Sequence, residues 1–203
     1  MEAAFRGEIS QGGDLALRLR VAFAEPSQGD WSFLEGQANS LWNAGLIEAY
    51  HAATNPNQSF IRQAQLRAPR RFGPNRTVQA SLEAPYGDVT MQGGPIFSPI
   101  RLDGGASLVF DRAPDLLARV TWGDGPEEYV LRGLVRRLAL DADGTVLGPG
   151  GSESSIGWGL AAHARLPLGR WMTSFGSDEL LLMCHYGEGI GRYFAGSTSA
   201  RRP

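Results

Sequence analysis

The sequence predicts an all-β protein with the architecture of an antiparallel transmembrane β-barrel. Three observations predict this class. About ten segments alternate between apolar residues and small or charged ones with a period of two, which is typical of strands with one apolar face. Clusters of Gly, Pro, Asp and Asn separate these segments. Several apolar faces end in aromatic residues, as the interfacial girdles of membrane barrels do.

The alternation is clearest in two segments, where every second residue from Leu15 to Phe23 and from Ile156 to Leu166 is apolar or alanine. Weaker copies give the other expected strands. In chain order the predicted strands are residues 5–10, 14–24, 31–37, 60–68, 77–84, 106–110, 116–122, 129–140, 156–166 and 178–186. The turn signals between them are residues 11–13, 73–75, 123–126, 141–144 and 148–151.

Residues 39–59 differ from the rest because they carry Leu41, Trp42 and an Asn-Pro-Asn sequence without clear alternation. We interpret them as a long loop, in which a short helical turn is an open alternative. Long loops in barrels often carry function.

Alternation alone does not say whether the apolar face meets lipid or a protein core. The aromatic residues Phe23, Trp122, Trp158 and Tyr186 on the apolar faces, and the arginines on the opposite faces, favour lipid. A soluble β-sandwich or an up-and-down ligand-binding barrel remains the alternative.

The composition excludes several kinds of partner, metal site and membrane segment. The 203 residues correspond to a single domain, 1–203. The formal charge of −2, from 19 basic residues that are all arginine and 21 acidic ones, argues against a nucleic-acid partner. Cys184, the single cysteine, excludes an intramolecular disulfide and a multi-cysteine metal site. The longest purely apolar run, 180–184, is too short for a membrane-spanning helix, and residues 1–6 lack the pattern of a secretory signal.

No motif predicts catalysis, a cofactor or a metal. The glycines of residues 187–191 lack the Lys-Ser/Thr of a phosphate-binding loop, and no Gly-x-Ser-x-Gly nucleophile motif occurs. His51, His163 and His185 have no second ligand at metal spacing. A lumen-facing pair of His163 and His185 is one interpretation, and solvated or hydrogen-bonded core histidines are the other. The chain is therefore expected not to be an enzyme.

Arginine on the faces with small residues is the remaining positive signal. If these faces line a lumen, their arginines form a ladder that attracts carboxylates through bidentate pairing. The glutamates Glu8, Glu35 and Glu83 on comparable faces would pair with some of them, so the net potential stays open. The arginines of this ladder are Arg18, Arg20, Arg67, Arg119 and Arg165.

Several segments together resemble the DcaP-like outer-membrane porins of Gram-negative bacteria. The resemblance covers roughly residues 5–194, and it rests on collinear order and spacing rather than on any single piece. The matching segments are 17–23, 34–40, 55–67, 80–85, 114–120, 131–138, 157–160 and 186–193.

The resemblance implies a homotrimeric barrel in the cell outer membrane, in contact with its lipid. It implies passive diffusion of small anionic solutes, notably dicarboxylates and aromatic carboxylates, through an arginine-lined constriction. Glu35 and Gln37 would lie on the lumen wall nearby, whereas Arg132 and Arg136 stay open because their strand has aliphatic residues on both faces. The arginines that the resemblance assigns to the constriction are Arg18, Arg20, Arg62, Arg67 and Arg119.

The chain also departs from that family. Members begin with a signal peptide, commonly carry a coiled-coil segment, and close a barrel of about sixteen strands. Residues 195–203 match nothing in the family and lack a terminal aromatic strand. These departures predict an incomplete porin or a truncated remnant without function; a soluble β-rich ligand-binding module is the other alternative.

Overall fold

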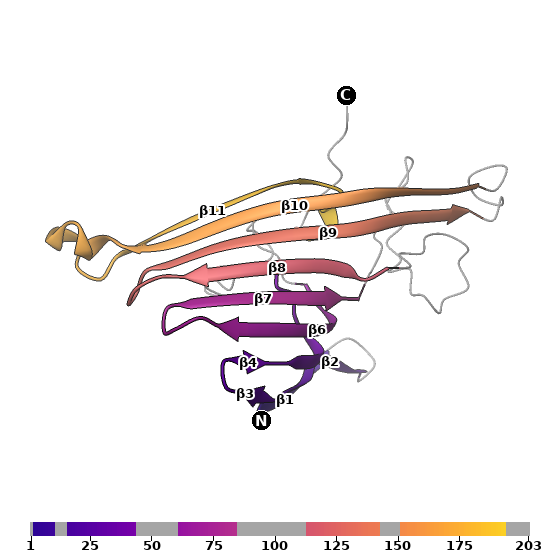
Figure 1. Cartoon of the computed structure of the whole chain (residues 1–203), viewed down its shortest axis with the longest axis horizontal. Helices are drawn as coiled ribbons and strands as arrows, with labels where there is room; N and C mark the ends of the chain where they lie inside the picture. Colours follow the sequence, from indigo (N-terminus) through magenta and orange to yellow (C-terminus); the bar gives the residue numbers. More distant parts are fainter. Residues whose placement is uncertain (1, 11–15, 44–60, 85–112, 143–150, 194–203) are drawn as a thin grey trace.

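A computed structural model describes residues 2–10, 16–43, 61–84, 113–142 and 151–193, and these form one eleven-stranded antiparallel sheet (Figure 1). The predicted all-β antiparallel class is confirmed. Apart from the small β3–β4 hairpin, neighbours in the sheet are successive strands of the chain. The strands are β1 Glu2–Ser10, β2 Ala16–Glu25, β3 Ser27–Gln28, β4 Trp31–Ser32, β5 Leu34–Asn39, β6 Arg62–Arg71, β7 Arg76–Glu83, β8 Asp115–Trp122, β9 Glu128–Ala142, β10 Gly151–Pro167 and β11 Glu179–Glu188.

The predicted strands match these elements with three differences. The segment 31–37 divides into β4 and β5 at Phe33, whose amide donates to the carbonyl of Pro26. Strands β9 and β10 are longer than predicted, and their register runs without a break from Gly151 opposite Ala142 to Arg165 opposite Glu128. The predicted strand 106–110 lies outside the described residues.

The connections at the two ends of the sheet differ in length. At one end, residues 72–75 join β6 to β7, residues 123–127 join β8 to β9, and the longer segment 168–178 joins β10 to β11. Gly73 and Gly125 have φ of 72° and 61° there, which tight turns need and glycine adopts without steric cost. At the other end, residues 40–61 and 84–114 make much longer connections. Short turns at one end and long loops at the other are typical of outer-membrane barrels.

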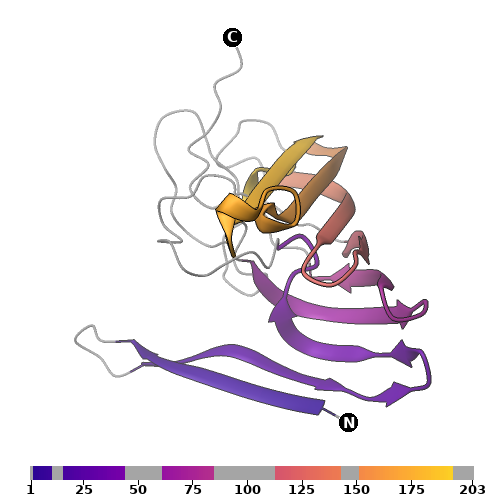
Figure 2. The same cartoon turned by 90° about the vertical axis from the view of Figure 1, so that its left-hand side faces the viewer.

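The sheet is curved, and among the described strands β1 and β11 form two edges that do not pair with each other (Figure 2). In the described ranges the helical elements are three short 3-10 turns, η1 (Leu168–Arg170), η2 (Thr173–Phe175) and η3 (Gly191–Tyr193), and no helix there is long and apolar enough to span a membrane.

Strand alternation gives the sheet an outer face that is apolar and exposed. Leu160 is 58% exposed and Tyr186 73% exposed. The register places many of these side chains side by side, as in the row Leu66, Leu82, Leu116, Val135 and Trp158. The large exposed side chains of the outer face between β6 and β11 include Leu66, Val78, Leu82, Leu116, Leu131, Val135, Ile156, Trp158, Leu160, Leu182 and Tyr186.

The inner face, on the concave side, carries the polar side chains. Its members are Gln63, Gln65 and Arg67 of β6, Gln79, Ser81 and Glu83 of β7, Asp115, Leu117 and Arg119 of β8, Val130, Arg132, Leu134 and Arg136 of β9, Gly157, Gly159, Ala161, His163 and Arg165 of β10, and Leu181, Met183 and His185 of β11. Most of the polar residues among them are buried. The sheet therefore buries charge and exposes hydrocarbon, the reverse of a soluble domain.

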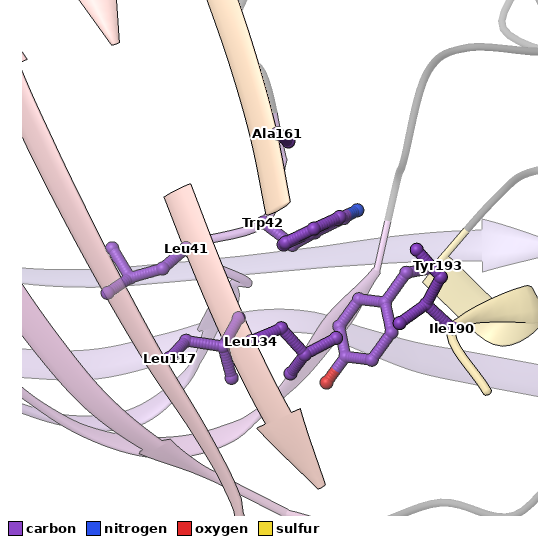
Figure 3. Packing of buried hydrophobic residues seen from close by; sticks show 7 residues of the cluster. All are labelled: Leu41, Trp42, Leu117, Leu134, Ala161, Ile190 and Tyr193. Carbon is purple, nitrogen blue, oxygen red and sulfur yellow. The ribbon is translucent and has the colours of Figure 1, made fainter. Parts of the chain in front are cut away.

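A small apolar cluster lies on the inner face (Figure 3). Trp42 is its centre and is fully buried, with the Tyr193 ring 5.8 Å from its own. Gly159 makes room for the indole, because a Cβ there would lie 2.9 Å from Trp42 Cη2. The cluster consists of Leu41, Trp42, Leu117, Leu134, Ala161, Ile190 and Tyr193.

Candidate functional site on the inner face

The segment Ser40 to Asn43, which starts the predicted long loop, folds onto the inner face. Glu83 is completely buried and accepts a hydrogen bond from the Leu41 amide at 2.9 Å, and others from Ser81 Oγ at 2.8 Å and from Gln63 Nε2. Asn43 closes the base of the segment, because its side chain donates to the Ile61 carbonyl at 3.0 Å and accepts from the Ile61 amide at 3.2 Å. A carboxylate with three donors holds this segment across the sheet.

Arg132 joins the same segment to the next pair of strands. Its guanidinium donates to the Trp42 carbonyl and lies 5.7 Å from the centre of the Trp42 ring. It is only 3% exposed, and its Nε and Nη2 have no hydrogen-bond partner among the described residues. Buried guanidinium donors without a partner are rare in folded proteins, and they leave positive charge directed into the concave side of the sheet.

Arg119 lies directly opposite Arg132 in the register of β8 and β9, and it is within electrostatic range of both Arg132 and Arg67. Its Nε donates to Thr121 Oγ1 at 3.2 Å. Arg67 donates to Gln65 Oε1, at 3.0 Å from Nε and 2.6 Å from Nη2, and to the Asn39 carbonyl. Within the described part of the chain, neither Arg67 nor Arg119 has a carboxylate within 4.0 Å. Three like charges thus share one stretch of wall.

A buried ion pair lies toward the long-loop end of the inner face. Arg136 Nε is 3.5 Å from Asp115 Oδ1, and both side chains are buried. The Tyr193 hydroxyl donates to Asp115 Oδ2 at 2.6 Å. Asp115 is therefore neutralised by its partners and contributes little to the field above Arg119 and Arg132.

Toward the short-turn end the inner face is more balanced in charge. His163, which is buried, lies 3.2 Å from Glu128 through Nε2 and Oε1. Arg165 Nε lies 3.9 Å from Glu179 Oε2, and both of these side chains are about one third exposed. His185 contacts the Trp42 ring, with 5.7 Å between the ring centres. His163 and His185 therefore share the inner face, each held by its own neighbour.

The structure brings together some of the predicted wall residues and separates others. Arg67, Arg119 and Arg165 lie on the inner face. Three other predicted wall residues lie on the outer face. Arg62 is four residues before the outward-facing Leu66 on β6, and Glu35 is the register partner of Leu66. Gln37 is the register partner of Ala64, which faces the same way as Leu66. Arg62 and Arg67 are five residues apart, and a regular strand points such residues to opposite faces.

Arg18 and Arg20 lie in β2, where Arg18 is opposite Glu8 of β1. Their side chains fall outside the described part of the structure, so their assignment to the wall stays a prediction. Phe23, expected on the apolar face, is half-buried and lies opposite Gly36.

Sequence reasoning did not assign Gln63, Asp115 or Tyr193 to contacts on the inner face, and it did not predict that Trp42 packs there. A Trp next to Leu in a polar loop was the one available signal, since a large apolar pair in a long loop needs a place to be buried. Arg132 and Arg136, left open on the sequence, are both on the inner face. In the described ranges no group of three or more His, Cys, Asp or Glu side chains is placed to hold a metal ion.

The comparisons with known proteins concern the fold. No protein-family model matches the chain, and no curated protein sequence matches it. The crystal structure of the outer membrane channel DcaP of Acinetobacter baumannii matches with a TM-score of 0.69 and 20% identity, over 96% of this chain. The match covers 49% of that channel, so the chain spans about half its length. The chain thus has the fold of a wall of an outer-membrane β-barrel channel.

Proposed function

We propose that the chain forms a wall of a trimeric outer-membrane β-barrel channel, through which small anionic solutes such as dicarboxylates or aromatic carboxylates diffuse passively. The likeness in fold to an outer membrane channel supports the channel part of this proposal. The closed pore requires a partner strand for each of the edges β1 and β11.

The observation that carries the proposal is the distribution of side chains on the two faces. Leu160 and Leu131 are more than half exposed, while Arg132 and Glu83 are at most 3% exposed. In water such an outer face would be a large apolar patch of the kind that drives association. Against lipid it is the expected surface, with a polar interior behind it. A soluble ligand-binding module predicts the opposite distribution.

The preference for anions rests on the charges that remain available on the inner face. Glu83 is enclosed by donors and Asp115 is buried in an ion pair with Arg136, whereas Arg67 and Arg119 have no carboxylate within 4.0 Å among the described residues. Glu83 and Glu128 act on Arg67 and Arg119 from beyond ion-pair distance. Arginines that make no ion pair among the described residues raise the local concentration of anions and offer paired N–H donors that match a carboxylate.

The test is ion selectivity in planar lipid bilayers. The protein is refolded in detergent and reconstituted, and the reversal potential is measured across a KCl gradient. The proposal predicts stable channels whose reversal potential has the sign of chloride selectivity, and block of the chloride current by succinate or benzoate. Channels selective for potassium would contradict the anion assignment, and absence of any conductance would favour a remnant without function.

A further inference from the structure

We propose that Arg70 and the aromatic side chains around it bind the phosphate group of a membrane phospholipid at the short-turn end of the outer face. This inference rests on the proposed function, because it requires the outer face to meet lipid. It adds a ligand site that the channel function does not need.

The site lies at the end of β6, beside the β3–β4 hairpin. Arg70 is exposed and is the register partner of Trp31. Its guanidinium carbon lies 5.1 Å from the centre of the Trp31 ring and 4.5 Å from that of Phe72. Trp31 in turn stacks on Phe33, with 6.2 Å between ring centres and 6° between planes. Two exposed aromatic rings thus contact the cation, and a third exposed ring stacks on one of them.

The contacts with the two rings use none of the N–H donors of Arg70 as hydrogen bonds to oxygen. Arg70 makes no hydrogen bond and no ion pair within the described residues, so its five N–H donors have no protein acceptor there. Contact with aromatic rings restricts the positions of a guanidinium, and its paired donors match two oxygens of a phosphate.

The surroundings of Arg70 point to a lipid as the source of that phosphate. Arg70 shares the outer face with Val78, its partner in β7, and the apolar rows begin there. A hollow of about 410 Å³, lined by Gln28, Trp31 and Phe33, adjoins the stack. Aromatic and basic side chains at the edge of an apolar band are where lipid headgroups lie. The short-turn end of such barrels faces the periplasm, whose leaflet consists of phospholipid.

The neighbouring residue supplies a matched control. Arg71 has the same side chain and also ends β6. Its partner in β7 is Thr77, which faces inward like Gln79, so the alternation puts Arg71 on the inner face. Arg71 lines a hollow of about 500 Å³ together with Pro69 and Gln79, which share that parity, and Trp31 borders this hollow as well as the one beside Phe33. A lipid on the outer face therefore contacts Arg70 and not Arg71.

The experiment titrates the refolded protein in dodecyl maltoside with dioleoyl phosphatidylglycerol and counts retained lipids by native mass spectrometry. Flotation with vesicles of phosphatidylethanolamine and phosphatidylglycerol first establishes membrane association. We expect the wild type to retain one phospholipid, Arg70→Gln to bind it about tenfold more weakly, and Arg71→Gln to bind it as the wild type does. Arg70→Lys, which keeps the charge without the planar fork, should give an intermediate affinity.

The outcomes separate this inference from the function on which it rests. A wild type that fails to float with vesicles overturns both. A wild type that floats and an Arg70→Gln variant that retains phospholipid normally overturn the lipid site alone. The lipid site would also be overturned if the Arg70 and Arg71 variants lost equal amounts of lipid affinity. The same holds if inorganic phosphate competed as well as phosphatidylglycerol does, or if the lipid changed the oligomeric state without being retained.

Discussion

Arg119 of β8 and Arg132 of β9 lie directly opposite each other on the inner face of the sheet. Like charges in this arrangement destabilise a sheet, so their presence calls for compensation. Arg132 obtains part of it from the carbonyl and ring of Trp42, whereas the hydroxyl of Thr121 is the one hydrogen-bond partner of Arg119 among the described residues. Glu128 is within electrostatic range of Arg119. Further compensation would come from anions in solution, which is the basis of the proposed selectivity.

Removing the charges of Arg67 and Arg119 tests whether these arginines produce the proposed anion selectivity. A unit charge about 4 Å from an ion is worth about 1 kcal/mol in water. The double substitution Arg67→Ala, Arg119→Ala should therefore lower the ratio of chloride to potassium permeability by at least about fivefold, measured from reversal potentials. Arg62→Ala, on the same strand as Arg67 but on the opposite face, should leave the ratio unchanged. An equal effect of Arg62→Ala would contradict the assignment of Arg67 to the inner face and of Arg62 to the outer face.

The outer face is tested by charge insertion. Leu160 lies between the aromatic pairs Trp158–Tyr186 and Trp122–Tyr129. Leu160→Arg should destabilise the folded protein in lipid by about 2 to 4 kcal/mol, because it places a charge in hydrocarbon. Leu180→Arg, near the β10–β11 turn, should cost about 0 to 1 kcal/mol. Urea unfolding in vesicles gives both values. Equal, small costs are the result for a surface that meets water.

The inward segment depends on Glu83. Replacing this carboxylate with alanine leaves the buried Leu41 amide and Ser81 hydroxyl without their acceptor, at a cost of about 1 to 3 kcal/mol. Glu83→Ala should accelerate hydrogen exchange at the Leu41 amide and raise the open-channel conductance. The exposed Glu35 gives the control, since Glu35→Ala should change neither. Unchanged protection of Leu41 would show that other contacts hold the segment.

The ion pair of Asp115 and Arg136 is expected to contribute to stability. Asp115→Asn leaves a buried arginine without its countercharge, which costs about 3 to 5 kcal/mol. Asp124→Asn, in the exposed turn between β8 and β9, should be neutral. Denaturant midpoints of the refolded variants in one detergent compare the two. Similar midpoints would mean that water reaches Asp115 and screens the pair.

The sequence predicted most strands, because period-two alternation and glycine-containing turns are local signals. It also placed Arg67, Arg119 and Arg165 together, since each occupies the polar parity of a regular strand. It placed Glu35 and Gln37 on the inner face, which is wrong, because the register with β6 puts both on the outer face. In the short β5 the apolar residues Leu34 and Ala38 face inward, and the parity is set by pairing with β6, which is not a local signal.

The burial of Arg132 and Arg136 also could not be predicted from the sequence. Strand β9 has aliphatic residues on both faces, which conceals its orientation. The structure gives the reason: Leu134 faces inward because the segment containing Trp42 covers that part of the inner face with apolar atoms. A contact between residues 42 and 134 has no local signature, and neither do the donors that converge on Glu83.

The central claim is that the outer face meets lipid. The most direct measurement is spin-label accessibility at Leu182 and at Met183, adjacent residues on opposite faces of β11, each changed to Cys in a Cys184→Ser background and reconstituted in vesicles. The account predicts frequent collisions with oxygen and few with a polar nickel complex at position 182, and more frequent collisions with the nickel complex at position 183. Frequent collisions with the nickel complex at position 182 would place the outer face in water and contradict the account.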